Sequence, residues 1–336
     1  MSAPQFSRRR LLAGAAGTAG AAALATAAGS TEAAAATAAA PTPAPGPYAL
    51  KLPHQIEAEA LIDNLRLRPW DQNANRYKTA GEFEDVYTTV RWGTAGHPEE
   101  YYNLSQCSSF LTLALQRAYG TQPTVPAGTP LPWGSYSYGW ATRDYFQQYF
   151  IKDPANPNPY PTAEKYQQAF LDTAALPHFT RVTKPVYLRP GDLVALDYYP
   201  KEDNTKPYTG HIVMIRQRKG TWSDPVVDAV FDRPVVPYVF EIIDCTSDPH
   251  GNPDLGGTAT DLFRAFPDTR IEEIPTTAGT SAWKEHDGAG YGHMIFYADA
   301  ETKLFAGYRW SVNAPKARKV ADRPITAGRV WLSDSI

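Results

Sequence analysis

The spacing of apolar positions predicts helices in the first half of the chain. Residues 55–65 carry apolar side chains at helical intervals, and residues 107–119 do so most clearly. The second segment is followed by Gly120, a residue type that commonly stops a helix in a left-handed conformation. Two further helical patterns cover residues 138–150 and 163–176. These later patterns are set apart from the strongest helix by a loop rich in proline and glycine.

From residue 180 onward the pattern changes to short β-branched and aromatic runs separated by turn residues, which is typical of strands. The runs are residues 180–188, 191–199, 211–217, 238–246, 293–300 and 329–332. Helices followed by strands favour an α+β fold in which helices pack on one side of an antiparallel sheet. We expect residues 51–336 to form a single domain with a helical insertion at about 121–180.

The first 40 residues have the order of an export signal. Three arginines at positions 8–10 precede a weakly apolar Ala/Gly stretch, and small residues that suit a cleavage site follow at positions 34–40. The paired arginines resemble a twin-arginine signal. Residues 41–50 form a Pro-rich linker. We therefore expect a secreted or cell-wall-associated protein that engages the twin-arginine export machinery.

Composition narrows the class of protein. Without residues 1–40, which hold three arginines and one glutamate, the chain keeps 29 basic and 34 acidic residues and a formal charge of −5. This charge disfavours a nucleic-acid partner. With 43% apolar residues and no run of 18 strongly apolar residues after the signal, we expect a large core, no membrane span and a monomer.

Three separated residues suit nucleophilic catalysis by a thiol. Cys107 opens the clearest helix, where free backbone N–H groups favour a thiolate. His211 begins a strand directly after Gly210, and Asp244 stands near the end of another strand. A thiolate, an imidazole that takes up its proton and a carboxylate that orients the imidazole form a catalytic triad. Gln106 is the candidate for a side-chain donor to the oxyanion.

The third member of this triad stays open at the level of sequence. Strand alternation places Asp244 and Ile242 on one face and Ile243 behind them, so Cys245 is the less favoured nucleophile. Alternatives to Asp244 are Asp228, Ser247 and His250. The two cysteines also allow a Cys107–Cys245 disulfide, which would remove the nucleophile.

A metal site and a nucleotide site are both disfavoured. Metal binding would have to use His211, His250 and His293 with Asp248 or Asp254, but no spacing fixes two ligands on one element. We therefore expect no metal and no cofactor. The glycines in the run 288–292 precede no helix, so they predict a turn or bulge and not a dinucleotide site. The remaining histidines are expected at the surface: His54, His97, His178 and His286.

Three motifs give the chain a family resemblance. They are Gln106-Cys107-Ser108-Ser109-Phe110-Leu111, Leu188-Arg189-Pro190-Gly191-Asp192-Leu193-Val194 and Gly210-His211-Ile212-Val213-Met214-Ile215. In sequence and order they resemble the papain-like cell-wall cysteine peptidases of the NlpC type. Segments 244–251 and 307–311 are similar to uncharacterised secreted actinobacterial members. The resemblance implies a papain-like fold, with a cysteine-bearing helix on an antiparallel sheet, and hydrolysis of peptide or amide bonds in peptidoglycan stem peptides.

The chain departs from this family at several positions. Gln106 stands where the family usually has an acid, and Ser109 replaces the usual glycine. The long separation of Cys107 from His211 requires the insertion at 121–180 to form a lid or a wall of the substrate site. Two other functions therefore stay open: a catalytically inactive wall-binding protein on the same scaffold, and a transglutaminase-like acyl transferase.

Overall fold

The computed structural model describes residues 51–79, 88–121, 138–156, 158–198, 210–222, 225–276 and 281–331. The chain divides into two units, residues 1–40 and residues 41–336, and all described residues belong to the second unit. The predicted export signal and linker, and residues 122–137 of the predicted insertion, lie outside the described residues.

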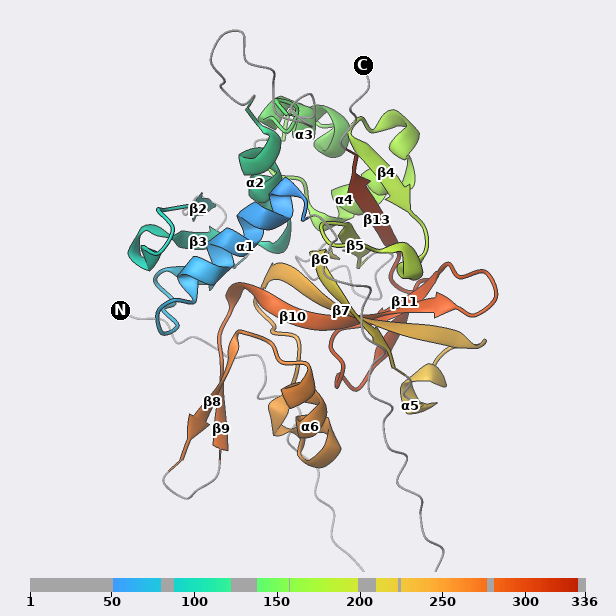
Figure 1. Cartoon of the computed structure of the whole chain (residues 1–336). Coiled ribbons are helices and arrows are strands. Elements are labelled where there is room, and N and C mark those ends of the chain that lie inside the picture. Colours follow the sequence, from blue (N-terminus) through green and yellow to red (C-terminus); the bar gives the residue numbers. More distant parts are fainter. Residues whose placement is uncertain are drawn as a thin grey trace, which may run out of the picture. The chain divides into compact units, whose positions relative to one another are not determined.

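The fold is α+β, as the order of helical and strand patterns predicts. Its largest element is an eight-stranded sheet in the order β12-β11-β10-β7-β6-β5-β13-β4, with every neighbouring pair antiparallel (Figure 1). The strands are β4 (Phe179–Val182), β5 (Leu193–Asp197), β6 (Gly210–Thr221), β7 (Val235–Thr246), β10 (Gly288–Asp299), β11 (Phe305–Arg309), β12 (Ala317–Lys319) and β13 (Ile325–Val330).

Two smaller sheets lie beside the large one. The first has the order β1-β3-β2, and the second is the hairpin β8-β9. Their strands are β1 (Asn75–Tyr77), β2 (Thr89–Arg91), β3 (Tyr102–Ser105), β8 (Ile271–Pro275) and β9 (Ser281–Glu285). Short polar strands of this kind carry a weak periodic signal, and the hydrophobic pattern did not predict them.

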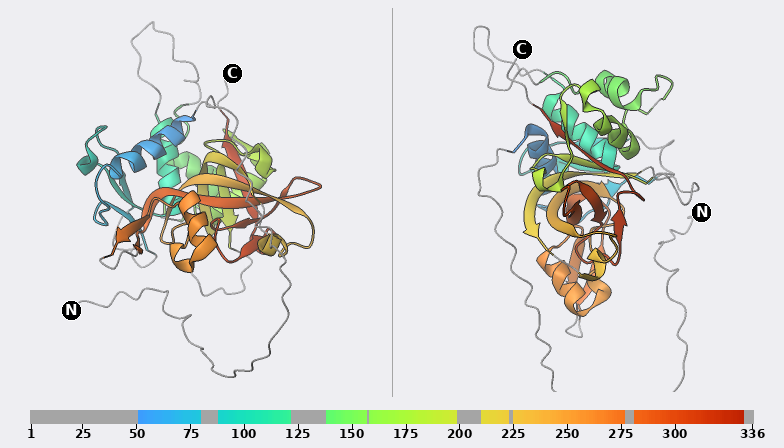
Figure 2. Two further views of the ribbon diagram at one scale, coloured as in Figure 1. Left: turned by 60° about the horizontal axis from the view of Figure 1, so that its bottom comes forward. Right: turned by 90° about the vertical axis from the view of Figure 1, so that its right-hand side faces the viewer.

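Helices cover one face of the large sheet, as Figures 1 and 2 show. The main ones are α1 (Pro53–Leu65), α2 (Cys107–Tyr119), α3 (Arg143–Phe146), the π-helical turn η5 (Gln147–Ile151) and α4 (Ala163–Leu171). The remaining helical elements are η3 (Pro98–Glu100), η6 (Thr173–Ala175), η7 (Pro185–Tyr187), α5 (Pro225–Asp228), η8 (Pro253–Leu255) and α6 (Gly257–Ala265). No helix in the described part of the chain is long and apolar enough to cross a membrane.

The two faces of the sheet bury separate cores. On the helical face, Ile212 and Met214 of β6 and Ile243 of β7 pack with α1, α2 and α4. On the other face, Val213 and Ile242 pack with strands from both ends of the sheet order. A small cavity is lined by β4, the start of β11 and β13, which brings the two ends of the sheet together. The sheet therefore curves around its second core.

The helix α2 begins where the sequence pattern predicts, because its start is capped. Gln106 is extended, and its backbone N–H donates to Ser109 Oγ at 2.9 Å. The predicted reason for its end is wrong. Gly120 has φ −75°, a right-handed value. Glycine is required there because a Cβ would lie 2.4 Å from the Gln116 carbonyl oxygen.

Part of the predicted insertion is a layer of the core. Phe146, Phe150, Tyr166 and Phe170 are buried in the same cluster as α2, and α4 packs against β5 and β13. The predicted second helix is shorter than expected, since it consists of α3 and the π-helical turn η5. The described part of the segment therefore supports the sheet.

Candidate functional site

The side chain of Cys107 lies at the first residue of α2, and it is 6% exposed. The strand β3 leads directly into this helix, so the backbone of Asn103 and Ser105 fixes the direction in which α2 starts. At a helix start the first four N–H groups lack intrahelical acceptors, and the positive end of the helix dipole stabilises a thiolate. The position at the start of α2 gives Cys107 the surroundings of a nucleophile.

His211 lies at the start of β6 and is 5% exposed. The preceding glycine lets β6 approach its neighbour, because a Cβ on Gly210 would lie 2.0 Å from the Leu196 carbonyl oxygen. His211 Nε2 lies 2.8 Å from Asp244 Oδ2. With Nε2 engaged by the carboxylate, Nδ1 is the ring atom left for the thiol.

The thiol and the imidazole interact electrostatically. Burial opposes the charged form of His211, but the Cys107 thiolate and the hydrogen bonds to Asp244 and Cys107 raise the pKa of His211 to about 9. An imidazole with this pKa is protonated at neutral pH. The structure thus brings Cys107, His211 and Asp244 together, with the imidazole between the thiol and a carboxylate.

Asp244 is fully buried, and both of its oxygens accept hydrogen bonds. Oδ2 accepts from His211, and it lies 3.0 Å from His250 Nε2. Oδ1 accepts from Arg270 Nη1 at 2.8 Å. Burial disfavours the carboxylate, but Arg270 and His250 hold the pKa of Asp244 well below its ordinary value. Asp244 is therefore an ionised acceptor at neutral pH.

Arg270 is itself clamped in place. Its Nε and Nη2 donate to the two oxygens of Asp268 at 2.9 and 2.8 Å, and its Nη1 also donates to the Gly288 carbonyl oxygen. Both Arg270 and Asp268 are buried. A two-point guanidinium–carboxylate contact fixes direction as well as distance. Asp268 therefore orients Arg270 towards Asp244.

Alternating glycines make room for this cluster. A Cβ on Gly290 would lie 3.0 Å from Arg270, and one on Gly292 would lie 2.6 Å from Asp268 Oδ2 and 2.8 Å from His250. The prediction of a turn or bulge in this run is wrong, since β10 pairs with β7 in unbroken register from Gly288 to Asp299. Glycines are needed in this strand because side chains from other elements approach its backbone closely.

Segments 244–251 and 307–311 meet at this point. The first supplies Asp244 and His250, and the second supplies Trp310. The indole stacks on His250 with ring centroids 4.1 Å apart and meets His211 edge-on at 4.8 Å. Trp310 thus covers both imidazoles.

The other candidates for the third residue lie elsewhere. Among the described residues, Asp244 is the carboxylate on His211 Nε2. His250 contacts Asp244 and not His211 Nε2, while Ser247 is exposed and Asp228 lies in α5. The geometry therefore favours Asp244.

Gln106 has a structural hydrogen bond. Its Nε2 donates to the Lys78 carbonyl oxygen at 3.1 Å, which ties the end of β1 to the start of α2. A side-chain amide carries two protons, so one remains for an oxyanion. The backbone N–H of Cys107 is the other donor that the helix start offers.

Cys245 lies on the opposite face of β7 and is fully buried. Both cysteines are free thiols, and Cys245 Sγ donates to the Ser105 carbonyl oxygen at 3.3 Å. Burial raises the pKa of Cys245 to about 12. Cys245 is therefore a packed thiol, and the alternative of a disulfide with Cys107 is not the arrangement found.

The donors His211, Asp244 and His250 lie within 4.8 Å of one another, close enough for a metal ion. His293 does not join them, because its Nδ1 faces the Pro267 carbonyl oxygen. The guanidinium of Arg270 on Asp244 opposes a second cation in the same place. The donor set therefore fits a hydrogen-bonded cluster better than a metal.

Two histidines predicted at the surface are buried. His54 is fully buried in α1, where Nδ1 lies 2.8 Å from Tyr119 Oη and Nε2 lies 2.7 Å from the Gly191 carbonyl oxygen. His286 is 5% exposed. Polar flanking residues suggested a surface position. A buried imidazole is nevertheless stable when partners distant in sequence form its hydrogen bonds.

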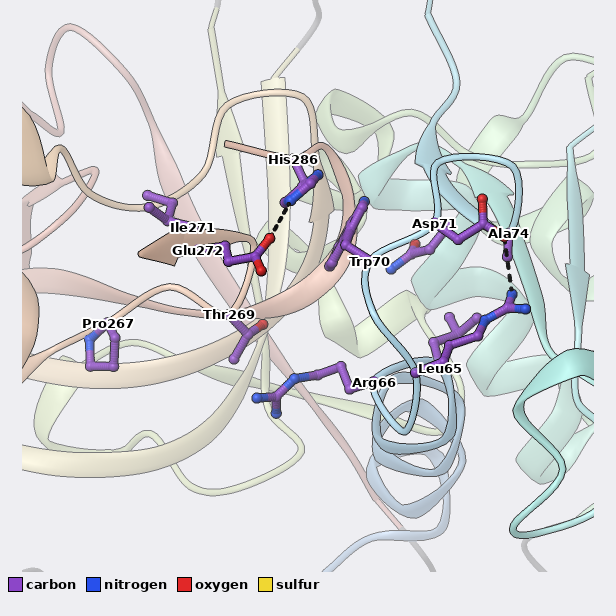
Figure 3. A pocket seen from close by; sticks show the side chains of 12 residues that line it. Leu65, Arg66, Trp70, Asp71, Ala74, Pro267, Thr269, Ile271, Glu272 and His286 are labelled. Carbon is purple, nitrogen blue, oxygen red and sulfur yellow. Dashed lines mark hydrogen bonds and ion pairs between the residues drawn. The ribbon is translucent and has the colours of Figure 1, made fainter. Parts of the chain in front are cut away.

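A cavity of about 360 Å³ lies next to the segment that carries Arg270 (Figure 3). Trp70 and His286 stack on one side, with ring centroids 4.9 Å apart, and Arg66 extends from the end of α1 towards Thr269. The lining does not include Cys107, His211 or Asp244. The cavity is therefore separate from the thiol cluster.

The hydrophobic pattern missed Arg270, Asp268 and Trp310. The first two lie in a loop without periodicity, and only the tertiary fold brings them to Asp244. The alternating glycines opposite β7 were the one local signal, since a strand without side chains on one face must receive side chains from elsewhere.

Comparison of the chain with protein-family models, curated proteins and solved structures found no match.

Proposed function

We propose that the protein is an exported cysteine hydrolase that cleaves peptide or amide bonds. The observation that carries this proposal is the contact chain in which Asp244 binds His211 Nε2 and Cys107 is the hydrogen-bonding partner that raises the pKa of His211. Stem peptides of peptidoglycan are the proposed substrate. The resemblance to NlpC-type peptidases and the twin-arginine pattern at residues 7–12 support this choice.

The reaction follows from the protonation states. The Cys107 thiolate attacks the amide carbonyl carbon, and the tetrahedral oxyanion is bound by the backbone N–H of Cys107. The His211 imidazolium then gives its proton to the departing amine as the C–N bond breaks. Water attacks the thioester carbonyl while His211 takes up one of its protons, and the C–S bond breaks to release the acid product and restore the Cys107 thiolate.

The proposal is tested first on the thiol, before any substrate is known. Brief iodoacetamide treatment of the unreduced protein at neutral pH, followed by peptide mapping, should label Cys107 and leave Cys245 unlabelled. Cys245 is the matched control, because its thiol is fully buried. An unlabelled Cys107, or a protein two mass units lighter than its reduced form, contradicts the proposal.

The second test uses purified peptidoglycan and its stem peptides. The wild-type chain should release new amino groups, and Cys107→Ala should release none. Added amines that appear in the product indicate acyl transfer in place of hydrolysis. A Cys107→Ala variant with undiminished activity, or a wild-type chain that only sediments with the wall, contradicts hydrolysis by this thiol.

A further inference from the structure

His250 is a buried imidazole that the proposed reaction does not use. It is 0% exposed, and both ring nitrogens have close partners. Nδ1 lies 2.6 Å from the Trp310 carbonyl oxygen, and Nε2 lies 3.0 Å from Asp244 Oδ2. Its backbone N–H donates to Asp268 Oδ2 at 2.7 Å. Both ring nitrogens and the backbone of His250 are therefore held in place.

The chemistry of these partners decides how many protons the ring carries. A backbone carbonyl oxygen only accepts hydrogen bonds, and an ionised carboxylate also only accepts. Both ring nitrogens of His250 must then donate, which requires an imidazolium. His54 is the contrast, because its Nε2 faces the Gly191 carbonyl while Nδ1 faces the Tyr119 hydroxyl, which donates. His54 is satisfied as a neutral ring.

The charges around His250 agree with a ring that carries two protons. Asp244 and Asp268 are the two carboxylates, and Arg270 provides one of the two cations that balance them. A charged His250 makes this buried cluster neutral. The Trp310 ring stacked on His250 also favours a cation.

The other elements packed on His250 bring one further titratable ring. From β6, His211 lies with its ring centroid 6.1 Å away. From β10, the nearest position is Gly292, which has no side chain. The next residue, His293, faces the Pro267 carbonyl oxygen. Asp244 and Asp268 are carboxylates that bond His250.

We propose that His250 is a charged positioning residue, an imidazolium that together with Arg270 holds Asp244 ionised and aimed at His211. Because these two cations balance the buried carboxylates, the charge of His211 is left to pair with the Cys107 thiolate. The catalytic consequence rests on the proposed thiol hydrolysis, whereas the protonation state of His250 does not.

The direct test is nitrogen NMR of the full chain with ¹⁵N-labelled histidine. Both ring nitrogens of His250 should carry protons at neutral pH, because each faces an acceptor. His54 should carry one proton at neutral pH. His250→Gln and His54→Gln assign the signals. An unprotonated ring nitrogen on His250 at neutral pH overturns the proposal.

A second measurement separates a charge effect from a structural one. Removing a cation near His211 should raise the pKa of His211 in His250→Gln by about half a unit or more. An unchanged or lowered pKa of His211 in His250→Gln contradicts the proposal. His293→Gln is the matched control and should leave His211 unchanged. Neither NMR readout needs a substrate, so failure of Cys107 labelling would refute the hydrolase and leave this inference standing.

Discussion

At the scale of single residues, His211 and His54 are both buried imidazoles whose pKa values shift in opposite directions. Burial lowers the pKa of His54 to about 4, and the hydrogen bond to the Gly191 carbonyl oxygen raises it only in part. The same burial acts on His211, but the thiolate of Cys107 and the carboxylate of Asp244 outweigh it. Burial therefore decides the pKa of His54, whereas charged partners decide that of His211.

This balance predicts the effect of removing the thiol. In Cys107→Ala the largest cause that raises the pKa of His211 is lost, so we expect that pKa to fall from about 9 towards its ordinary value of 6.5. Titration of the His211 ring by NMR measures the change. Cys245→Ala is the control and should leave the titration unaltered, since Cys245 bonds Ser105 on the other face of β7. A midpoint that stays near 9 would show that Asp244 alone holds the charge.

At the scale of elements, β10 shows how one strand can support a polar cluster that lies over it. Its residues Gly290 and Gly292 leave space above the sheet, and the loop before β8 fills that space with Arg270 and Asp268. Asp244 faces the same space from β7, since it pairs with Gly290 in the register. The cluster thus depends on small residues at alternate positions.

We expect Gly292→Ala to damage this cluster. The new Cβ would lie 2.6 Å from Asp268 Oδ2 and 2.8 Å from His250, so the change should cost about 1–3 kcal/mol of the free energy of unfolding. It should also shift the titration of His211 and slow alkylation of Cys107. Chemical denaturation and the labelling rate measure the two effects.

The control for this variant is Gly328→Ala on β13. Its Cβ would lie 2.4 Å from the Phe170 ring, in the apolar core below α4. It should destabilise the fold without altering the titration of His211. Equal shifts of His211 in both variants would mean that general loosening, and not the cluster, controls the imidazole.

At the scale of the whole molecule, buried histidines make the fold sensitive to acid. The unfolded ring of His54 binds a proton near pH 6.5 and the folded ring only near pH 4, so the unfolded state holds more protons in between. Stability should therefore fall as the pH is lowered from 6.5 to 4. The pKa of His293 is likewise lowered to about 4 by burial. Below that window, protonation of Asp244 removes its contacts with Arg270.

We expect the loss attributable to His54 to be about 3 kcal/mol across this window. Urea denaturation at a series of pH values measures the slope. His54→Gln should flatten it, whereas His97→Gln, a change at an exposed histidine, should not. A His54→Gln variant with the same dependence as the wild type would show that the ring is not neutral in the folded state.

The sequence by itself determined the elements whose signals are local. The helix at 107–119 and the central strands follow from the period of their apolar side chains, because the same side chains that make the period are those that pack. The candidates Cys107, His211 and Asp244 also followed from sequence, since each stands at an element boundary where polar groups are available.

Only the tertiary structure decided what surrounds those residues. Arg270 and Trp310 reach the site from loops and strand ends that have no periodic pattern, and the burial of His54 depends on partners 65 and 137 residues away. Gly290 and Gly292 leave room for side chains that are distant along the chain. Gly120 is required by the nearby Gln116 carbonyl oxygen, one helix turn earlier. The physical reason is that hydrogen bonds and charges of buried groups are satisfied across the fold, and a local pattern records only which side of an element is apolar.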